Sequence, residues 1–180
     1  VYHGLPTNLH TPNLKPSGDY VAFLGRISPE KRVDRAIRIA CAAGIPIRIA
    51  AKVDKADREY YEQEIKPMLS LPGVEFIGEI NERQKPEFLG NARAMLFPID
   101  WPEPFGIVMI ESMACGTPVL AFRNGSVPEV IDDGISGFIV DSEEEAVSVL
   151  QRTVNLDRRQ VRRRFEERFS ATRMAEDYVE

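Results

Sequence analysis

The chain has 180 residues, of which 43% are hydrophobic and 28% are charged, as is typical of one soluble globular domain with its own core. Its formal net charge of -5 argues against nucleic acid as a partner, since proteins that bind the phosphate backbone usually carry a basic surplus. No apolar run approaches the roughly 20 residues that a membrane-spanning helix needs, and no signal-peptide pattern is present, so we expect a cytoplasmic location.

Short apolar runs alternate with helical patterns along the chain. The runs typical of buried strands are residues 20–25, 46–51, 74–77, 94–97, 118–122 and 137–140. Helices are predicted from Ser28–Pro29 to about Gly44, and then over residues 56–69, 84–90, 107–114 and 128–131. Two or three further helices begin at about residue 142, where Ser142 and Glu145 form a capping box. This alternation predicts an α/β fold, a Rossmann-like parallel sheet of about six strands with helices on both faces.

The segment before the first predicted strand is rich in Pro, Gly and Asn. We interpret residues 1–18 as an interdomain linker and residues 19–180 as the domain itself, so that the chain would be one half of a longer enzyme. Both histidines of the chain, His3 and His10, lie in this leading segment. The body of the domain therefore has no histidine for a zinc site or a Ser-His-Asp triad.

The loop that follows the first predicted strand has the components of an anion site. Gly25 permits close approach of the backbone, and Arg26 and Lys31 carry positive charges five positions apart. The helix predicted after Ser28–Pro29 adds free backbone amides, which favour phosphate. The alternative is that both cations are solvated on the surface of a capped helix.

Two glutamates eight positions apart indicate a second site. Glu103 lies in a Pro-rich loop after the fourth predicted strand, and Gly106 allows a ligand to approach the start of the next helix. Glu111 lies in that helix among apolar residues, where burying a carboxylate is costly unless it is paired or binds hydroxyls. The pair predicts a ligand rich in hydroxyls; the alternative for Glu111 is a position facing solvent. A third polar loop, residues 123–129, is interpreted only as a turn followed by a short helix.

Motifs of several other functions are absent. No G-x-G-x-x-G follows the first predicted strand, and no G-x-x-x-x-G-K-[ST] occurs, which speaks against nicotinamide and P-loop sites. No D-x-D metal pair is present, so we expect no metal. The two cysteines, Cys41 and Cys115, lie in apolar helical contexts and are predicted to be buried free thiols, with a disulfide as the less favoured alternative.

Four motifs follow one another at intervals that match a known family. They are Phe23–Lys31, the Glu103–Gly106 element with Glu111, Ala114–Val119, and the segment from Pro128 to Gly137. Together they resemble the C-terminal, donor-binding domain of the retaining GT-B glycosyltransferases of the GT4 (glycosyltransferase group 1) family. The resemblance covers nearly the whole chain, and the ordered motifs make it more specific than the two glutamates alone.

The resemblance implies a nucleotide-diphosphate sugar (a UDP-, GDP- or ADP-sugar) as the donor, and no cofactor or metal. Arg26 and Lys31 would hold the diphosphate and neutralise its charge as it leaves, since fixed cations can stabilise that anion without a metal. Glu103 would contact the hydroxyls of the transferred sugar, and Glu111 would bind those of the ribose. The remaining donor-binding positions are Gly25, Phe105, Gly106 and Ile107, the last three acting through backbone amides.

The chain departs from the family's pattern at a few positions. Arg32 stands where glycine usually follows the lysine, Ser126 replaces the second glycine of a common pair, and Asp100–Trp101 replaces a loop that more often contains serine. The resemblance also implies an N-terminal domain for the acceptor (a glycan, a lipid or a small molecule), which this chain lacks. We therefore expect the isolated chain to bind its donor weakly and not to transfer sugar.

Two other classes of function stay open at this point. One is another GT-B enzyme: a nucleotide-sugar epimerase would bind the same donor, whereas a glycan phosphorylase would need a pyridoxal-phosphate lysine, for which there is no candidate. The other is a non-catalytic nucleotide-sugar-binding module. The presence of Arg26, Lys31, Glu103 and Glu111 together weighs against that reading.

Near the C-terminus, six arginines crowd one helical segment. Val161, Phe165 and Phe169 recur every four residues, which predicts a helix docked by an apolar face with a solvated basic face outward. Contact with anionic lipid at a membrane surface is a second interpretation, and packing against the absent domain is a third. The arginines are Arg158, Arg159, Arg162, Arg163, Arg164 and Arg168.

Overall fold

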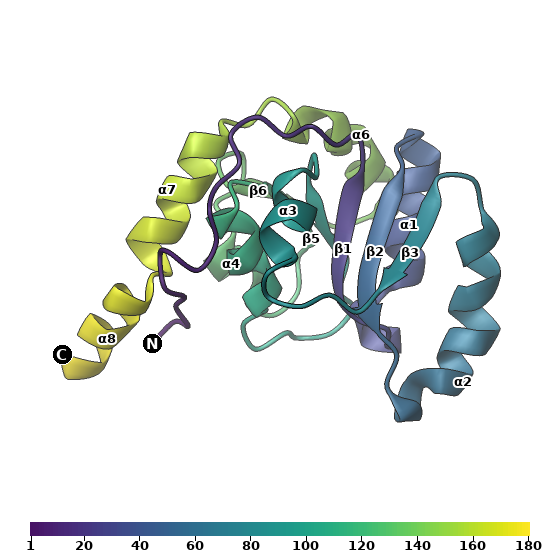
Figure 1. Ribbon diagram of the computed structural model, residues 1–180, viewed down its shortest axis with the longest axis horizontal. Helices are drawn as coiled ribbons and strands as arrows, with labels where there is room; N and C mark the ends of the chain where they lie inside the picture. The colour runs from purple at the N-terminus through teal and green to yellow at the C-terminus, as the bar shows by residue number, and fades with distance from the viewer.

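A six-stranded sheet forms the centre of the computed structural model, which describes residues 1–180 (Figure 1). Its strands all run parallel, in the order β3-β2-β1-β4-β5-β6. The α/β, Rossmann-like sheet predicted from the alternation of apolar runs is therefore confirmed. The strands are β1 (Val21–Arg26), β2 (Ile47–Lys52), β3 (Val74–Gly78), β4 (Met95–Phe97), β5 (Val119–Phe122) and β6 (Gly137–Val140).

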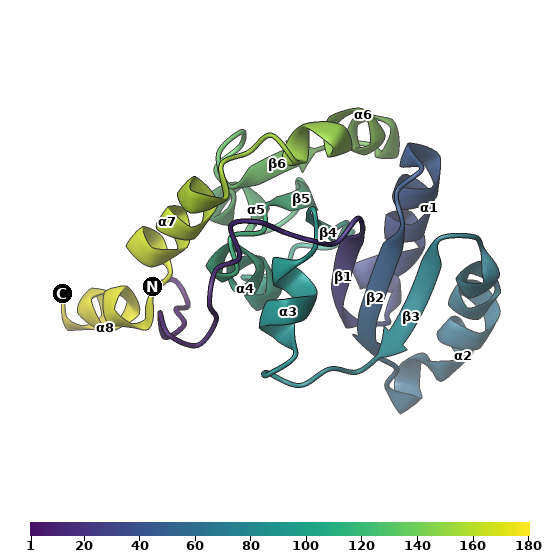
Figure 2. The same cartoon turned by 45° about the horizontal axis from the view of Figure 1, so that its top comes forward.

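Helices cover both faces of the sheet, because alternate residues of each strand point to opposite sides. Ala22 and Met95 belong to one apolar cluster, together with residues of α3, α4 and α7, whereas Val21 and Leu96 belong to a second cluster with α1 and α6. Figure 2 shows α6 beside α1, and the two helices are in contact. The helices are α1 (Val33–Ala43), α2 (Arg58–Tyr60), α3 (Lys85–Gly90), α4 (Ile107–Ala114), α5 (Val127–Val130), α6 (Glu143–Thr153), α7 (Arg158–Arg168) and α8 (Ala171–Val179).

The continuous helix predicted from Ser28–Pro29 to about Gly44 is divided into two pieces. Pro29–Lys31 forms a single 3₁₀ turn, the Ser28 side chain makes no capping hydrogen bond, and α1 begins only at Val33. Between them, Arg32 has a φ of 55°, in the left-handed region. Glycine adopts this conformation freely, but it is energetically costly for any residue that has a Cβ. The departure from glycine at this position thus imposes local strain, and two ion pairs of the Arg32 side chain, described below, offset it.

The helix predicted over residues 56–69 is broken into shorter pieces. After α2 the chain forms a π-helical turn over Tyr61–Ile65 and a 3₁₀ helix over Lys66–Ser70. Pro67 has no N–H to donate and its ring crowds the preceding turn, so a regular α-helix cannot pass through this position.

The leading segment packs along the surface of the domain. Leu5 pairs in parallel with Ser170, through hydrogen bonds of 2.9 Å from the Leu5 N–H to the Phe169 carbonyl and 2.8 Å from the Ala171 N–H to the Leu5 carbonyl. Figure 1 shows this segment running between α7 and the pair α3 and α4. Its role as a linker to another domain stays a prediction. None of the helices in the structure has both the length and the apolar content that crossing a membrane requires.

The two cysteines differ in their surroundings. Both are free, but Cys41 lies on the exposed side of α1, so the prediction that it is buried is wrong. Cys115 is buried, and this burial, together with the charge of Glu111, raises the pKa of its thiol to about 12. Cys41 does lie in a helix, as predicted, but its apolar neighbours in the sequence do not decide which side of that helix it occupies.

The basic face of α7 is only partly solvated. The helix docks through Val161 and Phe165, as predicted, but Arg158, Arg162 and Arg168 turn inward and donate to backbone carbonyls of neighbouring segments. Burial deprives a guanidinium of water, and carbonyl oxygens replace that hydration. The prediction of a solvated basic face is therefore wrong for these three side chains. Contact of the remaining arginines with anionic lipid stays a prediction.

Candidate functional site

The order of the strands reverses between β1 and β4, and ligands of open parallel sheets bind beyond the carboxyl ends of the strands at such a point. Two adjoining hollows lie there and share Leu24, Gly25 and Val108 in their walls. Lys31 lines the first hollow, and Lys85 lines the second, which has a volume of about 190 Å³. The predicted loops after β1 and β4 thus meet beyond the carboxyl ends of these two strands.

Lys31 and Glu103 form an ion pair beside the first hollow. Lys31 Nζ lies 2.6 Å from Glu103 Oε2, and the same oxygen accepts a hydrogen bond of 2.8 Å from the indole N–H of Trp101. The ammonium also lies over the rings of Trp101 and Phe97, 5.4 and 5.9 Å from their centroids. The exposed fractions of the two side chains are 20% for Lys31 and 11% for Glu103. The structure therefore joins two residues that the sequence placed in separate motifs, and Trp101, which had been noted only as a departure, orients the carboxylate.

The loops that carry these two residues are also joined to each other. The Asp100 N–H donates to the Glu30 carbonyl at 2.9 Å. Arg32 Nη1 lies 3.0 Å from Asp100 Oδ2, and Arg32 Nε lies 3.1 Å from Asp34 Oδ1. Arg32 and Asp100, two departures from the family's pattern, therefore compensate each other across the site.

Arg26 has other partners. It lies 3.1 Å from Glu30, 3.8 Å from Asp54 and 4.0 Å from Asp57, and its side chain is 48% exposed. None of its ion pairs is with Lys31's partner Glu103, so the structure does not bring the two predicted phosphate ligands to a common group. To contact a phosphate, Arg26 would have to exchange carboxylates for phosphate oxygens, which its exposure permits.

The amino end of α4 opens toward the same end of the sheet. Gly106 has a φ of 79°, and a Cβ there would lie 2.8 Å from the Met109 side chain and 3.0 Å from Phe97, so both backbone and space require glycine. Phe105 is buried and Ile107 is exposed. The first backbone N–H groups of an α-helix have no acceptor within it, and those at the start of α4 can donate to an anion or to a hydroxyl oxygen.

The loop after β5 does more than turn the chain. The Ser126 N–H donates to the Glu103 carbonyl at 2.9 Å, and the Ser126 hydroxyl donates to the Phe105 carbonyl at 2.7 Å. Gly125 has a φ of 54°, and a Cβ on it would overlap the backbone of Glu103. The interpretation of residues 123–129 as only a turn and a short helix was incomplete, because this loop supports the Glu103 loop from behind.

Glu111 is buried, so the alternative that it faces solvent is wrong. Lys85 Nζ on α3 lies 2.7 Å from Glu111 Oε2 and 2.5 Å from Glu82 Oε1, and His10 Nε2 lies 3.6 Å from Glu111 Oε2. Burial acts to raise the pKa of Glu111, but His10 and Lys85 outweigh it, so the pKa lies below its usual value. The carboxylate therefore stays charged at neutral pH.

Sequence reasoning missed Lys85 and His10. Lys85 lies in the helix predicted over residues 84–90 but was not selected as a site residue, and His10 was set aside because it lies outside the body of the domain. His10, Glu82 and Glu111 offer ligand atoms within 4.8 Å of one another, as a metal site would. Lys85 bridges the two carboxylates, however, and its own pKa is raised because these hydrogen bonds outweigh the effect of burial. The cluster therefore fits an ammonium group better than a metal ion.

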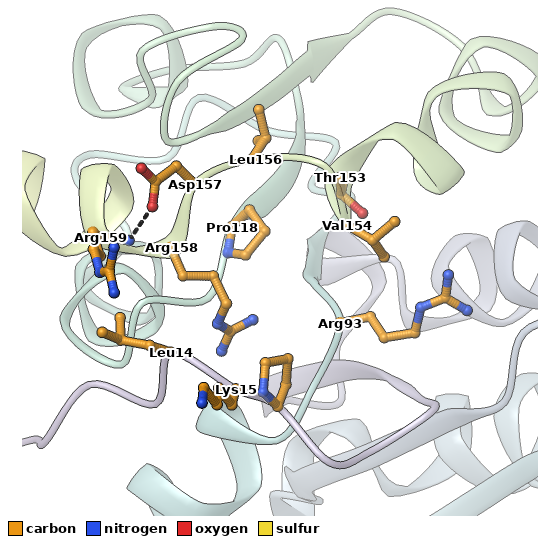
Figure 3. A pocket seen from close by; sticks show the side chains of 11 residues that line it. Leu14, Lys15, Arg93, Pro118, Thr153, Val154, Leu156, Asp157, Arg158 and Arg159 are labelled. Atoms are coloured by element: carbon orange, nitrogen blue, oxygen red, sulfur yellow. Dashed lines mark hydrogen bonds between the residues drawn. The ribbon is translucent and has the colours of Figure 1, made fainter.

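A separate hollow of about 380 Å³ lies at the opposite end of the sheet, beside Pro118 and the start of α7 (Figure 3). The side chain of Arg158 points across it toward the leading segment. It donates to the carbonyls of Asn13 at 2.7 Å, Gly90 at 2.7 Å and Ala92 at 3.1 Å, and to the Thr117 hydroxyl at 2.7 Å. Desolvation by burial lowers the pKa of Arg158 to about 10. These contacts join the leading segment to α3 and α7.

Residues 7–169 of the chain match the family described as Glycosyl transferases group 1. The chain belongs to this family. The match includes the loop after β1, the two glutamates and the loop after β5, so the resemblance seen in the ordered motifs is confirmed.

Two similar proteins support this membership. The chain is 32% identical over 143 residues to the GDP-mannose-dependent alpha-(1-6)-phosphatidylinositol dimannoside mannosyltransferase of Mycobacterium tuberculosis, covering 77% of this chain and 36% of the relative. It is 31% identical over 126 residues to the alpha-maltose-1-phosphate synthase of Mycolicibacterium smegmatis, covering 67% of this chain and 32% of the relative. The chain thus spans about a third of the length of these curated relatives.

Solved structures share the fold. AviGT4, a glycosyltransferase involved in Avilamycin A biosynthesis, matches with a TM-score of 0.83 and 25% identity, over 98% of this chain and 55% of its own. HepE of Anabaena, in complex with UDP and glucose, matches with a TM-score of 0.83 and 20% identity, over 98% of this chain and 54% of its own. This chain therefore has the fold of about half of each of these two proteins.

Proposed function

We propose that this chain is the donor-binding half of a glycosyltransferase that takes a sugar from a nucleotide-diphosphate sugar and passes it to an acceptor with retention of configuration. The observation that carries the proposal is a pair of lysines, Lys31 and Lys85, that line two adjoining hollows at the point where the strand order reverses. Each lysine forms an ion pair with a predicted glutamate, Lys31 with Glu103 and Lys85 with Glu111. One carboxylate beside each hollow suits an extended ligand with hydroxyl groups at both ends. Residues 1–18 would connect this half to an N-terminal acceptor domain.

The chemistry of the reaction fits these groups. Breaking the bond between sugar and phosphate builds positive charge on the sugar and negative charge on the leaving diphosphate. Lys31, Arg26 and the amides at Gly106 and Ile107 would stabilise the diphosphate, since preorganised cations and dipoles act most strongly in a partly desolvated site. Glu103, held by Trp101, would bind the sugar hydroxyls. Such a site needs no metal to stabilise the leaving group.

The nucleotide of the donor stays open among UDP, GDP and ADP. One relative's name specifies GDP-mannose, and one similar structure contains UDP, and these names differ in the base. In this chain Glu111 would bind the ribose, a part that all three nucleotides share. The base would then extend toward Glu79 and Ile80, which line the second hollow after β3.

Calorimetry of the chain against UDP, GDP and ADP and their sugars tests the donor site. We expect one nucleotide to bind, and Lys31→Ala and Arg26→Ala to weaken it by about 10- to 100-fold, because each charge-assisted contact is worth about 1.5–3 kcal/mol. Two surface residues provide matched controls: Lys66 pairs with Glu62, and Arg173, with an exposed fraction of 50%, pairs with Asp177. Lys66→Ala and Arg173→Ala should leave binding unchanged. Binding of no nucleotide, or equal losses in all four variants, would contradict the proposal.

A transfer assay tests the division of labour. The chain alone should bind donor without transferring sugar, because the acceptor site would lie on the absent N-terminal domain. Transfer by the isolated 180 residues would refute this part of the proposal. In the complete enzyme, the anomeric configuration of the product and activity in the presence of a chelator would test retention and metal independence.

A further inference from the structure

His10 is an unusual residue for the leading segment, because its side chain is completely buried. Neither Nδ1 nor Nε2 has a hydrogen-bond partner. Burying an unpartnered polar group costs free energy, so a group of this kind calls for an explanation. The imidazole faces the carboxylates of Glu111 and Glu82, with Nε2 at 3.6 Å and 3.8 Å from their Oε2 atoms.

The backbone around His10 is tied to the same helix that carries Glu111. Arg162 Nη1 donates to the His10 carbonyl at 2.9 Å and to the Ala114 carbonyl at the end of α4 at 2.7 Å. Arg162 Nη2 donates to the Thr7 carbonyl at 2.6 Å. Because one guanidinium holds the segment and the last turn of α4 together, His10 and Glu111 keep their relative positions.

The contacts of Glu111 are unequal between its two oxygens. Oε2 faces both Lys85, at 2.7 Å, and His10, at 3.6 Å. Oε1 accepts no hydrogen bond within the chain, and it is not among the enclosed unpartnered atoms. Lys85 and His10 thus approach one oxygen and leave the other open for a ligand. Rotation of this carboxylate about its Cγ–Cδ bond would move Oε2 away from both Lys85 and His10.

We propose that His10 is a positioning residue of the donor site, which holds Glu111 so that Oε1 receives a ribose hydroxyl. This inference rests on the proposed function, because it requires Glu111 to bind the ribose. The distance of 3.6 Å from His10 Nε2 to Glu111 Oε2 is just beyond hydrogen-bond length, so a shift of about half an ångström on nucleotide binding would complete the bond. His10 then acts only through Glu111 and makes no contact with the nucleotide.

The test compares a ribonucleotide with its 2′,3′-dideoxy counterpart. The probe is whichever of UDP, GDP and ADP binds the chain. In the wild type we expect the ribonucleotide to bind about 10- to 100-fold more tightly, since Glu111 is charged and its hydrogen bonds to the two hydroxyls are charge-assisted. His10→Phe should reduce this ratio several-fold while the dideoxynucleotide binds as before. His10→Gln, which keeps a side-chain N–H donor, should restore most of the ratio.

Two further variants make the result specific. Glu111→Ala should abolish the preference for the ribonucleotide, and Leu9→Ala, on the exposed neighbour of His10, should leave it unchanged. A normal ratio in His10→Phe alongside its loss in Glu111→Ala would overturn the role of His10 and leave the donor site intact. Failure of the wild type to bind all three nucleotides would instead refute the proposed function, and the role of His10 with it.

Nuclear magnetic resonance of the wild type gives a second measurement that requires no folded His10 variant. The chain has two histidines, so the spectrum of His3→Gln identifies the ring signals of His10. The ring nitrogen signals of His10 should shift when the ribonucleotide binds and shift less with the dideoxynucleotide. Equal responses to the two ligands, or none to either at saturation, would contradict the proposal.

Discussion

Replacing Gly125 with alanine tests whether the loop after β5 holds Glu103 in place. A Cβ on Gly125 would overlap the backbone of Glu103, whose carbonyl accepts the hydrogen bond from the Ser126 N–H at 2.9 Å. The methyl group therefore has to displace the Glu103 loop or move its own. Either movement changes the distance between the Glu103 carboxylate and Lys31.

Gly134 provides a matched control for the size of this effect. Its φ is 82°, so it too lies in the left-handed region, but a Cβ on it meets nothing within 4 Å. Alanine in that region costs about 1–2 kcal/mol at either position. Overpacking adds about 1–3 kcal/mol at Gly125 alone. We therefore expect Gly125→Ala to lower the free energy of unfolding by about 2–5 kcal/mol and Gly134→Ala by about 1–2 kcal/mol.

Urea unfolding measures both free energies, provided that the denaturant slope is the same in the two variants. Calorimetry should in addition show that Gly125→Ala binds the nucleotide sugar more weakly than the wild type does. Binding of the nucleoside diphosphate without the sugar should be affected less, because the displaced loop carries Glu103, the residue proposed to bind the sugar. Gly134→Ala should bind both as the wild type does. Equal destabilisation by the two substitutions, or unchanged sugar binding in Gly125→Ala, would refute the role assigned to this loop.

Three further predictions concern the buried charges and the thiols. Arg158→Met should lower the free energy of unfolding by about 2–4 kcal/mol, because four oxygen acceptors lose a charged donor. The exposed Arg159 provides the control: thermal or urea unfolding of Arg159→Met should give a free energy within about 0.5 kcal/mol of the wild type. A thiol reagent at about pH 8 should label Cys41 and spare Cys115 in the folded chain, since burial raises the pKa of Cys115 to about 12; mass spectrometry that finds both labelled before unfolding would contradict this. The folded state depresses the pKa of Glu111, so the charged carboxylate stabilises the fold at pH values above its ordinary pKa of 4.5, and this contribution disappears as the pH falls through the folded-state pKa. Glu111→Gln should therefore lower the free energy of unfolding by about 1–3 kcal/mol at neutral pH and by less in acid. A loss that does not change with pH would argue against the charge as its cause.

Local patterns predicted most of the secondary structure correctly. The apolar runs coincide with the six strands, and Ser142 caps α6 as predicted, with the Glu145 N–H donating to the Ser142 hydroxyl at 3.1 Å. The Glu145 carboxylate accepts from the Asp141 N–H at 2.8 Å, one residue before the cap, so the capping box is not the regular one. The errors fall where a single residue overrides the pattern. Arg32 in a left-handed conformation delays the start of α1, and Pro67 breaks the helix before it. The effect at Arg32 depends on ion pairs that propensity does not describe, whereas the break at Pro67 is a local signal that the prediction over residues 56–69 overlooked.

The sequence pointed to candidate residues of the site but not to their arrangement. Sequence reasoning selected Lys31, Glu103 and Glu111, and the structure places all three beside the two hollows. It could not show that Lys31 meets Glu103, 72 positions away, or that Lys85 lies against Glu111. Nor could it separate the arginines of α7 that turn inward from those that stay exposed, because both kinds recur with the same helical spacing.

The sequence by itself therefore determined the class of fold, because periodicity and turn chemistry act over a few neighbouring residues. The family came from the resemblance of four ordered motifs, and the donor-site roles proposed for the residues came from the same resemblance. Only the tertiary structure decided that β4 follows β1 in the sheet, which brings the two loops together, and that a segment at the start of the chain places His10 against Glu111. Contacts of this kind depend on strand order and on packing between distant segments. No local pattern specifies them, since the free energy that selects them is gained only when the whole core assembles.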